Sequence, residues 1–198
     1  MVGIIHYNMG NITSVINAYN LLGINAVVVR QPGELKAVSH IILPGVGAFR
    51  DGINFLHQLG FVTELKEQVV KNKKPFLGIC LGMQLMFGQG SEGGKFKGLG
   101  FLQGKVTKLP AKDVILPHVG WNTVTPLNQN TLLKLEGDMY FVHSFHVEPK
   151  DKSIVTATCN YGGVFPVMVE KDNMFGIQCH PEKSHKSGRN ILASFSKV

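Results

Sequence analysis

A cysteine between two glycines is the strongest chemical signal in this sequence. Cys80 is the centre of Gly78-Ile79-Cys80-Leu81-Gly82, between an apolar run expected to form a strand and a helical pattern. This G-x-C-x-G spacing has the form of a nucleophile elbow, in which flanking glycines permit a sharp turn that exposes the central side chain. A helix N-terminus also favours the thiolate, which is the attacking form. The alternative is a small buried cysteine at a strand end.

His180 and Glu182 could complete a catalytic triad with this cysteine. His180 ends an expected strand and is followed by Pro181 and Glu182. Residues two apart in an extended segment point to the same side. Glu182 could therefore bond one imidazole nitrogen while the other faces Cys80, the arrangement of nucleophile, base and orienting group. His-Pro-Glu alone is a weak signal, and it gains meaning only from the cysteine elbow.

An oxyanion formed at the thiol would need hydrogen-bond donors. The backbone N–H of Leu81 directly follows the cysteine and would face such an oxyanion. A second donor is expected from the loop Pro44–Gly47, which follows another expected strand and has glycines that let the backbone approach a ligand closely. An ordinary Pro-Gly turn is the alternative for this loop.

The elements that must position these residues follow from the apolar patterns. In the first half, strands are expected at Val2–His6, Ala26–Val29, His40–Leu43 and Pro75–Ile79. Helices are expected at Ile12–Leu22 and about Val62–Asn72, and another helix is expected to begin with Met83–Phe87. Strands that alternate with helices predict a parallel sheet. After a Gly- and Lys-rich loop at Ser91–Gly100, strands are expected at Leu102–Lys108, Met139–Phe145, Ile154–Thr158, Val167–Glu170 and Met174–Cys179, and a helix at Ile191–Phe195. The prediction is one α/β domain over residues 1–198 with an antiparallel extension.

Composition excludes several classes of protein. The 198 residues are 44% hydrophobic and 17% charged, which is incompatible with a disordered chain. The net charge of +7 comes from dispersed cations, not from a basic run interleaved with aromatics, so no nucleic-acid partner is expected. Three separated cysteines form no disulfide framework or zinc signature, and His143 and His146 are expected to face opposite ways. No membrane segment and no metal are expected, and a cytoplasmic protein is predicted.

Taken together, these motifs resemble the class I (triad) glutamine amidotransferases. The resemblance covers nearly the whole chain and is closest to the branch that supplies ammonia to a cyclase in histidine biosynthesis. It implies a flavodoxin-like three-layer fold with a central, mostly parallel sheet, L-glutamine as the substrate, and no cofactor. The segments that carry it are Tyr7–Asn11, Leu43–Phe49, Gly78–Gln84, Pro117–Asn122, Tyr140–Phe145, Tyr161–Gly163 and His180–Ser184.

The resemblance implies a role for each matching residue. Cys80 would attack the γ-carboxamide of glutamine to form a thioester, His180 would transfer the protons, and Glu182 would hold the histidine tautomer. The oxyanion donors would be Leu81 and either Val46 or Gly47. The residues that match glutamine-binding positions are Gly47, Gln84, Ser144 and Phe145.

The resemblance also implies a partner protein. This would be a cyclase subunit with a (β/α)8 barrel, forming a heterodimer through which ammonia passes, and the glutaminase would be nearly silent without it. The residues that match the docking face are Asn11, Pro117, His118, Trp121 and Tyr140.

Two other functions stay open at this point. His6, Asn8, Phe145 and Cys179 depart from the usual residues Asp, Gly, Tyr and Phe of the histidine-pathway branch. A paralogous branch supplies ammonia to enzymes that aminate sugars for surface polysaccharides, and Tyr-Asn-Met-Gly-Asn would suit it. A stand-alone cysteine hydrolase on a similar sheet is the alternative from a different class.

Overall fold

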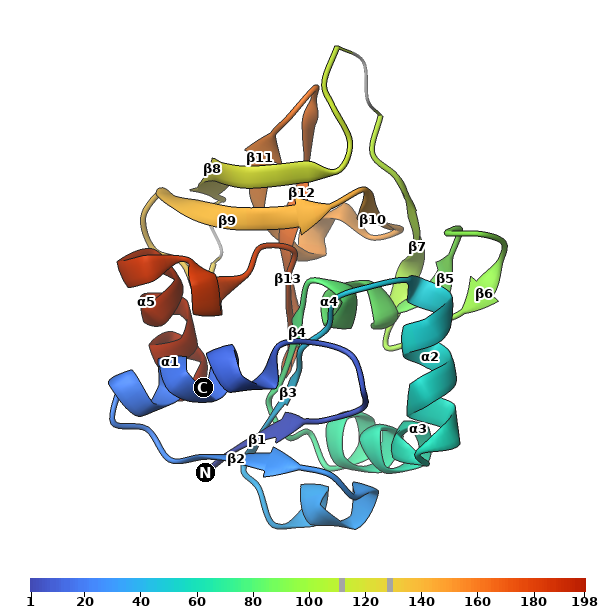
Figure 1. Cartoon of the computed structure of the whole chain (residues 1–198), viewed down its shortest axis with the longest axis vertical. Coiled ribbons are helices and arrows are strands. Elements are labelled where there is room, and N and C mark those ends of the chain that lie inside the picture. The colour runs from blue at the N-terminus through green and yellow to red at the C-terminus, as the bar shows by residue number, and fades with distance from the viewer. Residues whose placement is uncertain (111–112, 128–129) are drawn as a thin grey trace.

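The computed structural model describes residues 1–110, 113–127 and 130–198, which form two sheets, with helices packed around the parallel half of the larger one (Figure 1). Within these residues the larger sheet has nine strands in the order β2-β1-β3-β4-β13-β12-β11-β8-β9, and the smaller has four in the order β10-β7-β5-β6. The strands are β1 Val2–Ile5, β2 Ala26–Val29, β3 His40–Leu43, β4 Phe76–Ile79, β5 Phe87–Gly90, β6 Phe96–Lys97, β7 Leu102–Lys108, β8 His118–Pro126, β9 Gly137–His143, β10 Phe145–Pro149, β11 Val155–Asn160, β12 Val164–Lys171 and β13 Met174–Ile177. The α-helices are α1 Ile12–Leu21, α2 Phe49–Gln58, α3 Phe61–Leu65, α4 Leu81–Leu85 and α5 His185–Phe195, and a π-helical segment at Lys66–Lys71 continues α3.

The parallel half of the large sheet is covered by helices on both faces. β2, β1, β3, β4 and β13 run parallel to one another. Every residue of β1, β4 and β13 is buried, as expected for strands packed on both sides. One face packs against α1 and α5, and the other against α2 and α3 (Figure 1). This arrangement confirms the predicted α/β three-layer fold, and β12, β11, β8 and β9 form its antiparallel extension.

The structure differs from the predicted elements in several places. The expected strand Met139–Phe145 breaks at Ser144, so that β9 joins the large sheet while β10 pairs with β7 in the small one. Phe87, expected in a helix, begins β5. The prediction omitted β8, which has few buried positions and a glycine with φ of 135° at Gly120. It also omitted α2, although Phe49, Ile53 and Leu56 recur at helical spacing.

None of the described helices is long and apolar enough to cross a membrane.

Candidate active site

Cys80 lies at a strained turn between β4 and α4. Its backbone has φ of 53° and ψ of −107°, a combination that non-glycine residues rarely adopt and that often marks functional sites. The backbone N–H of Cys80 donates to the carbonyl of Ile177 at 2.7 Å, which ties the turn to β13. Both flanking glycines are needed, because a Cβ at Gly78 would lie 2.7 Å from backbone atoms of Gly82, and one at Gly82 would clash with the carbonyl of Leu43. The turn therefore has the geometry predicted for a nucleophile elbow.

His180 and Glu182 form a buried pair beside this turn. His180 Nδ1 lies 2.8 Å from Glu182 Oε1, and their side chains are 2% and 4% exposed. The sequence prediction placed them on an extended segment, but Pro181–Lys183 forms a 3-10 turn that begins directly after His180. Proline suits the first position of such a turn because its φ is already restricted. The turn thus orients the carboxylate toward the imidazole. The other ring nitrogen, His180 Nε2, is buried without a hydrogen-bond partner among the described residues.

The charges around His180 favour its protonated form. Burial alone would lower the pKa of His180, but the negative charge of Cys80 and the hydrogen bond and charge of Glu182 outweigh it and raise that pKa above its ordinary value. The imidazole of His180 is therefore placed where carrying a proton is favoured, beside the cysteine and the carboxylate.

The predicted oxyanion donors are not all free. The Leu81 N–H donates to the carbonyl of Gly45 at 3.3 Å, so this donor is engaged by the protein itself. Val46 is 39% exposed, and Gly47 is also exposed with φ of 112°. The Gly45 backbone is tightly enclosed, since a Cβ there would lie 2.5 Å from Tyr7 Oη and 2.8 Å from Leu81 Cβ. The loop therefore lies against the elbow, as predicted, but with a carbonyl turned toward Leu81.

A pocket of about 290 Å³ opens over the cysteine. It brings Cys80 and Leu81 together with all four residues predicted to bind glutamine, namely Gly47, Gln84, Ser144 and Phe145. Glu92 also lines the pocket but was missed by the sequence prediction, which treated Ser91–Gly100 only as a loop. Its Oε2 accepts a hydrogen bond from the Phe49 N–H at 2.8 Å, at the beginning of α2. An acidic residue in an otherwise basic loop was the only available signal.

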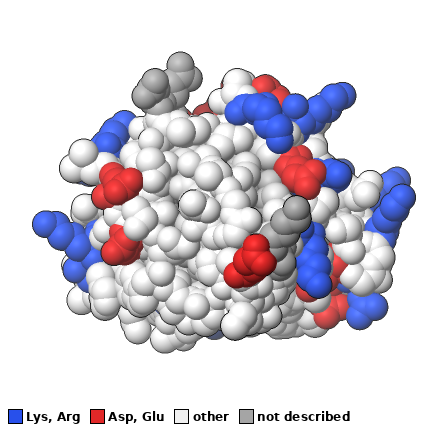
Figure 2. Space-filling model, turned by 90° about the horizontal axis from the view of Figure 1, so that it is seen from above, with Lys and Arg blue, Asp and Glu red and all other residues white. Residues whose placement is uncertain are grey.

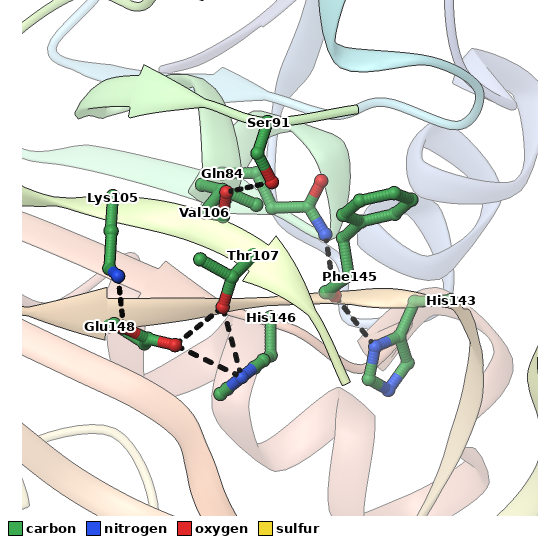
Figure 3. A network of polar contacts seen from close by, with 9 residues as sticks. All are labelled: Gln84, Ser91, Lys105, Val106, Thr107, His143, Phe145, His146 and Glu148. Carbon is green, nitrogen blue, oxygen red and sulfur yellow. Dashed lines mark hydrogen bonds and ion pairs between the residues drawn. The ribbon is translucent and has the colours of Figure 1, made fainter. Parts of the chain in front are cut away.

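The amide of Gln84 is held by two acceptors. Its Nε2 donates to the Phe145 carbonyl at 3.0 Å and to Gln178 Oε1 at 3.2 Å. The same carbonyl of Phe145 lies 2.9 Å from His143 Nδ1 (Figure 3). Both amide hydrogens of Gln84 are therefore used, which leaves its Oε1 as the atom available to a ligand.

A histidine pair lies next to this network. His143 Nε2 lies 3.1 Å from His118 Nδ1. Burial, together with the charges of His118, His146 and His180 and only partly opposed by the hydrogen bond to Phe145, lowers the pKa of His143 to about 3. His143 is therefore neutral at physiological pH.

The residues predicted to dock a partner differ in their exposure. Trp121 on β8 is 47% exposed, and its ring stacks on His185 with ring centroids 4.9 Å apart. Tyr140 on β9 packs edge-on against Trp121, and Lys183 Nζ lies 5.5 Å from the centre of its ring. Asn11, at the N-terminus of α1, and Pro117 are both exposed.

His118 does not fit the predicted docking role. It is 2% exposed, and its ring stacks on both Tyr161 and Phe141. A side chain enclosed in this way has no surface to offer a partner, and its contacts stabilise β8 from within.

The end of the molecule that carries β8 and β9 has few charges at its centre. Seen from this end, Lys, Arg, Asp and Glu lie mostly around the rim (Figure 2). A depletion of charge at the centre with charges at the rim is typical of protein–protein interfaces.

The chain is similar to known proteins over nearly its whole length. The family described as Glutamine amidotransferase class-I matches residues 4–197. The imidazole glycerol phosphate synthase subunit HisH 1 of Campylobacter jejuni is 42% identical over 202 residues, which is 100% of both chains. The corresponding HisH subunit of Desulfitobacterium hafniense is 46% identical over 200 residues, 100% of this chain and 94% of the relative. A solved glutamine amidotransferase has the same fold, with a TM-score of 0.78, 20% identity and 98% of each chain covered.

Proposed function

Because this chain belongs to the class-I glutamine amidotransferase family, we propose that it is the glutaminase subunit of an imidazole glycerol phosphate synthase. The observation that carries the proposal is the pocket that joins Cys80 to Gly47, Gln84, Ser144 and Phe145, next to the buried pair of His180 and Glu182. The similarity of relatives with this name extends over the whole chain and supports the choice of pathway.

Glutamine hydrolysis follows from the chemistry of these groups. The Cys80 thiolate attacks the γ-carboxamide carbon, and the protonated His180 gives its proton to the departing ammonia. The product is a glutamyl thioester. His180 then takes a proton from water, which attacks the thioester to release glutamate and regenerate the thiol. Glu182 keeps His180 Nδ1 protonated, so that Nε2 is the nitrogen that exchanges protons.

The pocket offers complementary groups for the amino-acid end of the substrate. The Glu92 carboxylate and Gln84 Oε1 are acceptors suited to the α-ammonium group of glutamine. The Ser144 hydroxyl is a donor suited to the α-carboxylate. These three groups would place the γ-carboxamide over Cys80 and discriminate glutamine from simple amides.

The partner is proposed to be a cyclase subunit with a (β/α)8 barrel that binds the charge-poor end of the molecule. Trp121 on β8 and Tyr140 on β9 are exposed and half-buried aromatics, which is the residue type most often found at the centre of interfaces. Ammonia released at Cys80 would pass into the partner and not into solvent.

The experiment that tests the proposal separates the two half-reactions. Cys80→Ser is expected to abolish glutamine hydrolysis, because a serine hydroxyl is a much weaker nucleophile, while synthesis from free ammonia in the complex with the cyclase subunit continues at the wild-type rate. Loss of the ammonia-dependent reaction in an assembled complex would contradict this division of labour. Absence of any stimulation by the cyclase subunit and its nucleotide ligand would instead favour a sugar-aminating partner.

A further inference from the structure

Gln178 is a buried amide that the mechanism above does not use. It lies directly after β13, two residues before His180, and its exposed fraction is 0%. Its backbone N–H donates to the Val167 carbonyl at 2.8 Å, which fixes the main chain at this point. Its side chain reaches Cys80, with Nε2 at 3.6 Å from Sγ. A buried amide in contact with the nucleophile can influence its reactivity.

The orientation of the Gln178 amide follows from its neighbours. The Phe145 carbonyl can only accept, so Gln84 must direct its nitrogen toward it, and the second hydrogen of that nitrogen points to Gln178. Gln178 therefore presents its oxygen to Gln84 and its nitrogen to Cys80 Sγ. A reversed amide would place two donors against each other at Gln84.

The histidine pair fixes this arrangement further. His143 also contacts the Phe145 carbonyl through Nδ1, so Nδ1 carries the proton and Nε2 must accept from His118 Nδ1. The chain of donors and acceptors from His118 to Cys80 is thus consistent at every step. Part of this chain, from Gln84 through Phe145 to His143, is visible in Figure 3.

The two protonation states of Cys80 have different partners. The protonated thiol can donate to the Val142 carbonyl, which lies 3.9 Å from Sγ. The thiolate cannot use that carbonyl, but it can accept the N–H of Gln178. Hydrogen bonds to a charged acceptor are stronger than those to a neutral one, so the Gln178 contact favours the thiolate.

We propose that Gln178 is a positioning residue for the reaction, whose side-chain amide donates to the Cys80 thiolate, holds the sulfur in place and favours the charged nucleophile. The inference rests on the proposed function, since it assigns a role in the same reaction. Other titratable groups that interact with Cys80 are His180, Tyr7 and Cys179. Burial raises the pKa values of Tyr7 and Cys179, so these two remain neutral, and His180 supplies the opposite charge.

Alkylation of Cys80 by iodoacetamide tests the role of Gln178 without glutamine. The rate is measured for the full chain between about pH 6 and pH 9.5, and Cys80 is identified by peptide mass spectrometry. Gln178→Met keeps the length of the side chain but removes the donor. It is expected to move the pH profile upward by about one unit, so that alkylation at pH 7 is about tenfold slower. Gln178→Glu, which places a carboxylate at the sulfur, should move it further.

A matched control is available in the segment that continues α3. Gln68 is also a buried glutamine, 4% exposed, and its Nε2 donates to Glu64 Oε1. Gln68→Met should leave the pH profile of Cys80 unchanged. An unshifted profile in a folded Gln178→Met variant would overturn the inference.

A measurement on the unsubstituted chain covers the case in which the variants do not fold. The 15N–1H signals of the Gln178 side-chain amide should change with pH at the same midpoint as Cys80 alkylation, and an amide that does not respond would also overturn the inference. A different result would contradict the proposed function. A chain without glutaminase activity in the complex contradicts the function whatever the alkylation profile, whereas an active chain with an unshifted profile contradicts only the role of Gln178.

Discussion

The backbone N–H of Leu81 donates to the carbonyl of Gly45 at 3.3 Å, so the first proposed oxyanion donor is bonded to the loop that is proposed to supply the second. Because of this hydrogen bond, one part of the proposed site is assembled in the isolated chain and another part is not. The cysteine elbow and the histidine–glutamate pair are assembled in the isolated chain, whereas the oxyanion site requires the Gly45 carbonyl to turn away.

The isolated chain is therefore expected to be a poor glutaminase. Loss of one oxyanion donor typically lowers kcat by about 10²–10³-fold. Glutamate release should rise by at least about 100-fold when the cyclase subunit and its nucleotide ligand are added. A chain that is fully active alone would show that the Gly45 contact does not restrain the reaction.

Glu182→Gln should strongly reduce glutamine hydrolysis. The change removes the charge that helps to raise the pKa of His180 and offers an NH2 group to Nδ1, which favours the wrong tautomer. Loss of the equivalent carboxylate in a serine protease triad costs about 10⁴-fold, so we expect a fall in kcat of about 10²–10⁴-fold. Ammonia-dependent synthesis in the same complex is the control and should be unchanged. A fall in kcat of less than about tenfold would show that Glu182 is not a member of the triad.

Trp121→Ala should weaken binding of the cyclase subunit more than it weakens folding. A central aromatic in an interface contributes about 2 kcal/mol or more, which corresponds to an increase in Kd of about 30-fold. Since the side chain is 47% exposed, its loss should lower the free energy of unfolding by about 1 kcal/mol or less. Val70→Ala, an exposed apolar residue in the segment that continues α3, is the control for both measurements. Equal Kd values for the two variants would refute the docking role.

His143 should make the protein sensitive to acid. The folded state keeps this imidazole neutral down to about pH 3, whereas the unfolded chain binds a proton below its ordinary pKa of 6.5. Stability therefore falls as the pH drops below about 6.5, and at pH 5 the loss from this group is about 2 kcal/mol.

Urea unfolding at pH 7.5 and pH 5 measures this effect. His143→Gln can donate to the Phe145 carbonyl and accept from His118 but has no charge to gain, so its free energy of unfolding should change less between the two pH values than that of the wild type. Identical pH dependence in both proteins would show that His143 is not responsible.

Much of the site could be predicted from local patterns. The elbow depends on Gly78 and Gly82, whose need for close backbone approach appears directly as G-x-C-x-G. His180 and Glu182 are two residues apart, so their contact required no knowledge of distant segments. Even so, the expected extended segment is a 3-10 turn, because Pro181 favours the start of a helical turn.

Other features involve residues that are far apart in the chain. Glu92 reaches the pocket because it caps the beginning of α2 at Phe49. His118 is enclosed because Tyr161 and Phe141, from two other segments, pack on its ring. Neither environment can be read from the flanking residues, so Glu92 was not predicted in the pocket and His118 was expected at the surface.

The sequence by itself determined the candidate nucleophile, its proposed proton acceptor and the α/β alternation of strands and helices, because each depends on backbone constraints or periodicity within a few residues. Only the tertiary structure decided that Leu81 N–H bonds to Gly45, and that Gln178 presents its amide to Cys80. These contacts arise where separate strands of the sheet end side by side, and the hydrogen-bonding needs of buried groups there are met by residues far away in the chain.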